Sequence, residues 1–178
     1  MKNAVLAVAL AFAVAGCSTM QPPRYAPSAD NIVKLREFTG SKVTVSSLKM
    51  AATYDSGCRM MGPIEPADGL SIPDFIAKAL NDELKMAGVY AAGGRTLSGS
   101  VDRVLFSSSS GLVNGYWDLA VTLQSDNGRT LSAASLYNFK SGFDAATACN
   151  ATADALSSAV QDLIKVIVND PAFPALLQ

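Results

Sequence analysis

Two apolar stripes at helical spacing most constrain the fold of this chain. The first lies between Ser71 and Gly88, where apolar residues recur every three or four positions: Ile72, Phe75, Ile76, Ala79, Leu80, Leu84 and Ala87. Ser71 is a typical N-cap and Gly88 a typical stop. The second stripe runs from Asp144, another good cap, to Val168, where Asn169-Asp170-Pro171 ends it. Both segments are predicted helices, and each needs a surface on which to bury its stripe.

Four stretches alternate in the manner of half-buried strands. Lys42–Met50 precedes the first helix, and Thr96–Ser107, Tyr116–Ser125 and Arg129–Ser141 lie between the two helices. Asp126-Asn127-Gly128 is a strong hairpin signal between the last two. In Thr96–Ser107, every second residue is expected to lie on the same face of the sheet: Leu97, Gly99, Val101, Arg103 and Leu105.

This order predicts an α+β fold, a two-layer sandwich in which a roughly four-stranded sheet carries two helices on one face (β-α-β-β-β-α). Residues 32–38 are expected to form a short lead-in strand or turn. The apolar tail is expected either to pack on the sheet or to serve a partner; its apolar residues are Phe173, Leu176 and Leu177.

The N-terminus predicts export and lipid attachment. Lys2 is followed by an uncharged apolar run of about a dozen residues, shorter than the roughly 20 that span a bilayer. Val14-Ala15-Gly16-Cys17 then resembles the bacterial lipobox. The resemblance implies cleavage before Cys17, acyl chains such as palmitate on that cysteine, and, with Ser18 next, a lipid anchor in the outer membrane facing the periplasm. The alternative is an ordinary signal peptide cut at a small residue, with no role for Cys17.

The predicted organisation is therefore a signal peptide over residues 1–16, a lipidated tether over 17–31 and one periplasmic α+β domain over 32–178. The tether prediction rests on its prolines and serines, which offer little to a core.

With Cys17 acylated, Cys58 and Cys149 remain as an even pair in an oxidising compartment. A disulfide is the simplest interpretation, and two separate buried thiols are the alternative. Two cysteines in a chain without histidine make a poor tetrahedral metal shell, so no metal or cofactor is expected.

Composition argues against several functions. The net charge is −1 and the basic residues are scattered, so no nucleic-acid partner is expected. The absence of histidine removes Ser-His and Cys-His pairs. Asp82 and Glu83 are adjacent and should face different sides of a helix. The loop carboxylates Asp55, Glu65 and Asp68 do not have EF-hand spacing. The chain is predicted not to be an enzyme.

The irregular segment Asp55–Gly69 contains side chains that are unusual in a solvated loop: Arg59, Met60, Met61 and Ile64. Methionines adapt to irregular partners. The sequence leaves two alternatives: these residues form a partner-binding loop, or they pack into the core beside the disulfide.

The segment from Cys58 through the first helix, together with Cys149, resembles a group of small bacterial lipoproteins with a cysteine-arginine loop, a capped helix and a late helical cysteine. The order of elements is also similar to YajG-type lipoproteins and to the auxiliary lipoproteins of lipid-transport ABC systems. These resemblances imply an accessory subunit that binds an envelope protein without catalysis. The alternatives are a periplasmic inhibitor of a cell-wall-degrading enzyme and a lipid- or peptidoglycan-binding module.

Overall fold

The computed structural model describes Met20 and residues 22–178 of the 178-residue chain. The predicted signal peptide and the predicted acylation site, Cys17, lie outside the described residues. Within them, the helices and strands follow in this order: α2 (Ala29–Leu35), the 3-10 turn η1 (Arg36–Phe38), β1 (Val43–Met50), the 3-10 turn η2 (Ala67–Gly69), α3 (Ile72–Ala87), β2 (Arg95–Ser107), β3 (Asn114–Ser125), β4 (Thr130–Lys140), α4 (Ala145–Asn169) and α5 (Phe173–Leu177).

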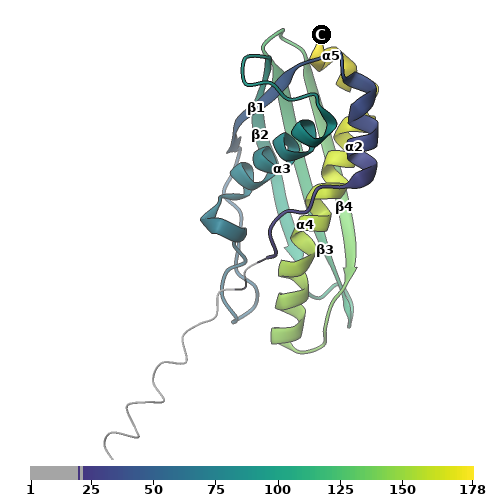
Figure 1. Ribbon diagram of the computed structural model, residues 1–178. Coiled ribbons are helices and arrows are strands. Elements are labelled where there is room, and N and C mark those ends of the chain that lie inside the picture. Colours follow the sequence, from purple (N-terminus) through teal and green to yellow (C-terminus); the bar gives the residue numbers. More distant parts are fainter. Residues whose placement is uncertain (1–19, 21) are drawn as a thin grey trace, which may run out of the picture.

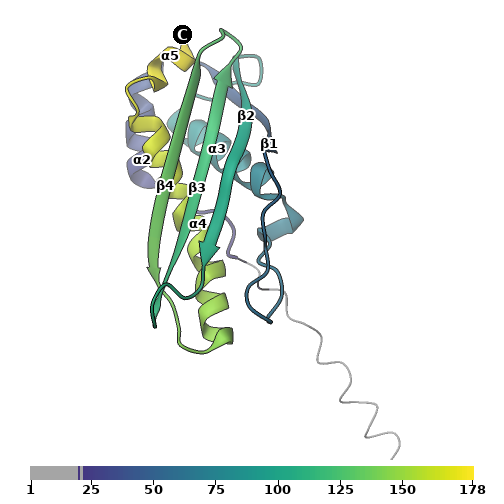
Figure 2. The ribbon, with the colours of Figure 1, turned by 180° about the vertical axis from the view of Figure 1, so that it is seen from behind.

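The four strands form one sheet in the order β1-β2-β3-β4. β1 and β2 are parallel, as the crossover through α3 requires, and the other two pairs are antiparallel. Helices α2, α3 and α4 lie on one side of the sheet (Figure 1). No element among the described residues covers the opposite face, here called the uncovered face (Figure 2). The predicted α+β two-layer sandwich is therefore confirmed.

Local signals set the ends of the long elements as predicted. The Ser71 side chain accepts a hydrogen bond from the backbone N–H of Asp74, and Gly88 ends α3 in the left-handed region at φ 76°. Asp144 caps α4 by accepting from the N–H of Thr147. Gly128, at φ 84°, closes the turn between β3 and β4. Capping and turn chemistry thus place both helices and the hairpin.

The predicted face of β2 is wrong beyond Val101. A bulge shifts the register between Val101 and Arg103, so that two residues oppose Ala120 of β3. Val104 is consequently buried and Leu105 is 52% exposed. The bulge sends Arg103 and Leu105 to the uncovered face of the sheet.

The predicted tether is wrong for residues 22–31, and the lead-in strand or turn is replaced by α2 and η1. Residues 22–38, here called the N-terminal strap, pack against the helical layer. Ile32 and Leu35 of α2 are buried, and α2 contacts both α3 and α4. Ser28 caps this helix by accepting from the N–H of Asn31. A seven-residue helix is too short to show a convincing period in the sequence.

The apolar tail forms α5 and packs on the domain. Phe173 and Leu176 are fully buried, and the Phe173 ring meets that of Phe38 edge-on with centroids 5.5 Å apart. Ser125 Oγ donates to the Leu176 carbonyl at 2.8 Å. The tail, η1 and the β3–β4 hairpin at 126–129 together close one end of the molecule, here called the far end (Figure 1).

Candidate functional site

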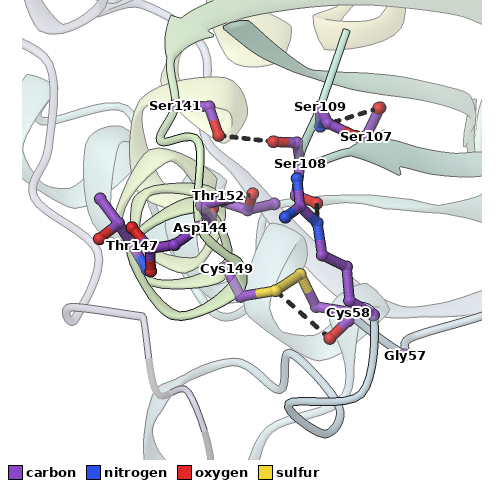
Figure 3. Close-up of a disulfide and its surroundings, with 12 residues drawn as sticks. Gly57, Cys58, Ser107, Ser108, Ser109, Ser141, Asp144, Thr147, Cys149 and Thr152 are labelled. Atoms are coloured by element: carbon purple, nitrogen blue, oxygen red, sulfur yellow. Dashed lines mark hydrogen bonds between the residues drawn. A yellow bond between two sulfur atoms is a disulfide. The ribbon is translucent and has the colours of Figure 1, made fainter. Parts of the chain in front are cut away.

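Three loops meet at the end of the molecule opposite α5. They are residues 57–62 of the long loop, 108–113 between β2 and β3, and 141–144 between β4 and α4, here together called the loop end. The predicted disulfide is confirmed: Cys58 and Cys149, 91 residues apart in sequence, are bonded with their Cα atoms 5.9 Å apart. It fastens the first loop to the second turn of α4 (Figure 3).

Hydrogen bonds join the same three loops. Arg59 Nε donates to Ser108 Oγ at 3.1 Å and its Nη1 to the Phe143 carbonyl at 3.4 Å. Ser141 Oγ donates to the Ser108 carbonyl (Figure 3), and the Ser141 N–H donates to the Val113 carbonyl at 2.9 Å. Arg59 is thus a cross-link between the loops. Its own backbone, at φ 51°, lies in the left-handed region.

The structure separates the four residues of the predicted partner-binding loop. Met60 is 100% exposed, whereas Met61 is half-buried against the core. Ile64 is 1% exposed and belongs to the core, so its prediction as a partner contact is wrong. The core alternative therefore holds for Ile64 and in part for Met61, and partner binding stays a prediction for Arg59 and Met60.

Sequence reasoning missed three further apolar residues at the loop end. Leu112 is 74%, Val113 46% and Phe143 79% exposed. Each stands within a polar turn: Leu112 and Val113 follow the serine run, and Phe143 follows Ser141-Gly142. An apolar residue within a polar turn was the only sign in the sequence that these side chains are exposed. The sequence could not show that these turns meet beside Met60.

A buried carboxylate holds the N-terminal strap in place. Glu83 of α3 is fully buried, and its Oε1 accepts from the Tyr25 hydroxyl, from the Ser28 N–H at 2.8 Å and from Asn31 Nδ2 at 3.4 Å. Asn31 Nδ2 also donates to the Gln161 carbonyl of α4 at 3.0 Å. The strap is therefore tied to α3 through the acidic side chain of Glu83 and to α4 through the amide of Asn31.

The protonation of this network is shifted. Burial raises the pKa of Glu83 above its usual value, and the hydrogen bonds from Tyr25, Ser28 and Asn31 offset only part of that shift. Burial, followed by the bond to Glu83, raises the pKa of Tyr25. Glu83 Oε2 is buried and has no hydrogen-bond partner among the described residues. Asp82, its neighbour, instead pairs with Lys78 and Lys85 at the surface, as the predicted difference in faces requires.

The first described residue of the chain, Met20, lies beside the loop end. Met20 is 4% exposed and forms a parallel bridge with Ile64. The N–H of Ile64 donates to the Ser56 carbonyl, and Gly57 bridges Pro63, so Met20 lies at the base of the loop that carries Cys58. The described chain therefore starts beside the loop end at Met20 and continues through the strap to Phe38 at the far end.

Other candidate chemistry is sparse in the part of the chain that the structure describes. There, no three or more His, Cys, Asp or Glu side chains gather as a metal site would require. Likewise, no helix among these residues has the length and apolar character to cross a bilayer. A depression of about 550 Å³ at the far end has a mostly polar lining that includes Lys42, Arg95 and Asp126.

Comparison with known proteins does not identify a family for this chain. No family model matches the sequence, and no curated protein matches it. Among solved structures, the chain is similar to a dodecamer of a PelC point variant from Paraburkholderia phytofirmans, with 17% identity over 88% of this chain and 92% of that one and a TM-score of 0.40. A likeness this weak supports no functional conclusion. The resemblance to YajG-type lipoproteins stays a prediction.

Proposed function

We propose that this protein is a periplasmic lipoprotein, anchored in the outer membrane through Cys17, that serves as a non-enzymatic accessory subunit of an envelope assembly. The observation that carries the proposal is the position of Met20, which is buried at the base of the Cys58 loop. Only three peptide steps separate Cys17 from Met20, a span of at most about 10 Å. An acylated Cys17 would therefore hold the folded domain close to the membrane.

A domain held so closely offers its partner a restricted orientation. The strap, tied by Glu83, joins the anchor segment to the helical layer, so the domain cannot swing freely as it would on a long tether. Restricting the orientation of a binding surface lowers the entropy lost when a partner binds. This property suits an accessory subunit.

We infer that the envelope partner binds the uncovered face of the sheet. Leu105 and Leu136 flank Asp118 in the register of β2, β3 and β4, and they are 52% and 59% exposed. Asp118 accepts two hydrogen bonds from Arg103, at 2.8 and 2.9 Å. Two exposed leucines around an ion pair match the mixed apolar and polar character of protein interfaces.

The anchor is tested by Cys17→Ala followed by cell fractionation. The variant should move from the membrane to the soluble periplasmic fraction, because acyl chains supply the membrane affinity. Mass spectrometry of the wild-type protein should find the acyl groups on an N-terminal Cys17. A Cys17→Ala protein that stays in the membrane fraction would contradict the anchor.

The partner face is tested by a photo-crosslinking amino acid at Leu136 in intact envelopes, with Met86 of α3 as the control position of similar exposure, 56%. Position 136 should capture one protein reproducibly, position 86 should not, and Leu136→Arg should reduce recovery of that protein with the lipoprotein. Equal capture at both positions would contradict the proposed face. If the captured protein is a cell-wall-degrading enzyme that purified lipoprotein inhibits, the inhibitor alternative replaces the accessory role.

A further inference from the structure

We infer that the loop end is a bilayer-contacting surface, on which Met60, Leu112, Val113 and Phe143 enter the boundary between headgroups and acyl chains. The inference rests on the proposed lipid anchor at Cys17 and adds to it a second contact, made by side chains. The domain would then stand on the membrane through its loop end, with the far end pointing into the periplasm.

The first argument is the concentration of exposed apolar side chains. Met60 is 100%, Phe143 79%, Leu112 74% and Val113 46% exposed. They come from three separate loops, which the Cys58–Cys149 disulfide, Arg59 and Ser141 join at one end. Several exposed apolar side chains at one end of a folded domain usually mark a contact with another surface.

The second argument is the place where the chain leaves the domain. Met20 pairs with Ile64 at the base of the loop that carries Met60. The Cα atom of Cys17, which carries the proposed lipid, can lie at most about 10 Å from that of Met20. β2 alone, with 13 residues, extends about 40 Å toward the far end. An acylated Cys17 therefore brings the loop end to the bilayer and leaves the far end away from it.

The third argument is the charge around the exposed apolar residues. Arg59 and Lys140 are cationic, while Asp144, Asp55 and Glu65 are anionic and lie on the same loops or next to them. Asp144 accepts from the Thr147 N–H, and Lys140 Nζ donates to Asn114 Oδ1 at 3.0 Å. The remaining polar groups are mostly serines. Opposite charges nearly cancel, so the surface fits a largely zwitterionic bilayer, and the contact should depend only weakly on salt.

The test uses the acylated mature protein, which begins at Cys17, in vesicles of phosphatidylethanolamine and phosphatidylglycerol. The vesicles contain a brominated phospholipid, which quenches nearby tryptophan. Met60→Trp and Phe143→Trp report on the loop end. Met86→Trp and Leu136→Trp are the controls, since these side chains are 56% and 59% exposed on other faces. Trp117 is fully buried in all variants and supplies a constant background.

Fluorescence from the tryptophans at 60 and 143 should fall by about half or more, and fluorescence from those at 86 and 136 by less than about a tenth, because only inserted side chains reach the bromines. Equal quenching at all four positions in protein that floats with the vesicles overturns the bilayer contact and leaves the anchor intact. Protein that is unacylated, or that does not float, overturns the anchor itself and the inference with it. A photo-crosslinking amino acid at Met60 that yields protein adducts instead of phospholipid adducts in intact envelopes also overturns the inference.

Discussion

The two ends of this molecule differ in how deeply their large apolar side chains are buried. At the far end, Phe173 and Leu176 are completely buried. At the loop end, Met60 and Phe143 are 100% and 79% exposed. The sequences of both ends contain large apolar residues next to turn formers, so composition does not account for the difference.

The means of holding each end together differs. The far end is closed by packing, as in the edge-on contact between Phe38 and Phe173, and by Ser125 donating to the Leu176 carbonyl. The loop end is held by the Cys58–Cys149 bond and by hydrogen bonds from Arg59. A loop that is cross-linked in this way keeps its shape without burying its own apolar side chains. Those side chains remain available for an external surface.

The largest effect should follow from removing the covalent cross-link. Cys58→Ser combined with Cys149→Ser should lower the free energy of unfolding by about 4 to 5 kcal/mol, because the bond closes a loop of 91 residues in the unfolded chain. Denaturant titration of the variant against the oxidised wild-type protein measures this. The reduced wild-type protein is the matched control and should behave like the variant. A loss below about 1 kcal/mol would mean that packing, and not the disulfide, holds the loop end.

The two ends can also be compared by replacing one phenylalanine at each of them. Phe173→Ala should cost about 4 kcal/mol of unfolding free energy, because it leaves a cavity against Phe38. Phe143→Ala should change it by less than about 0.5 kcal/mol, because that ring is 79% exposed. Thermal or chemical unfolding of the purified protein measures both. Equal losses would show that the loop end is also closed by packing.

The strap connects the two ends, and its docking should depend on pH through Glu83. Burial raises the pKa of this carboxyl in the folded state, so the folded state binds its proton more tightly than the unfolded state does. Stability should therefore fall as the pH rises above the usual carboxyl value of 4.5 toward the raised one. Glu83→Gln keeps an acceptor for Tyr25 and Ser28 and removes the titration.

The measurement is the difference in unfolding free energy between Glu83→Gln and the wild-type protein from pH 4 upward through neutrality. The difference should move in favour of the variant as the pH rises. A difference that is constant with pH would contradict the raised pKa of Glu83.

The smallest effect should follow from removing the Arg59 cross-link. Arg59→Ala should lower the global unfolding free energy by about 1 kcal/mol or less, because the side chain is exposed. It should nevertheless speed amide hydrogen exchange in residues 57–62 and 108–113. Arg103→Ala, which removes two hydrogen bonds to Asp118 on the uncovered face, is the control and should leave these amides unchanged. Unchanged exchange in both variants would show that the disulfide alone holds the loops.

The sequence by itself determined the long regular elements and the covalent bond. Ser71, Gly88 and Asp144 mark the ends of α3 and α4, and Asn127-Gly128 marks the hairpin, because capping and turn formation depend on residues a few positions apart. The pairing of Cys58 with Cys149 followed from counting cysteines. Caps and turns depend on neighbouring residues and the cysteine pairing depends on a count, so both can be predicted without knowing the fold.

Only the tertiary structure decided the rest. The bulge after Val101, the packing of the strap and the complete burial of Glu83 depend on partners in other elements. The loop end is the clearest case, since Met60, Leu112 and Phe143 are separated by at least 30 positions in the chain. They lie in three separate turns, and they come to the same end of the molecule because the sheet, α4 and the disulfide bring those turns together.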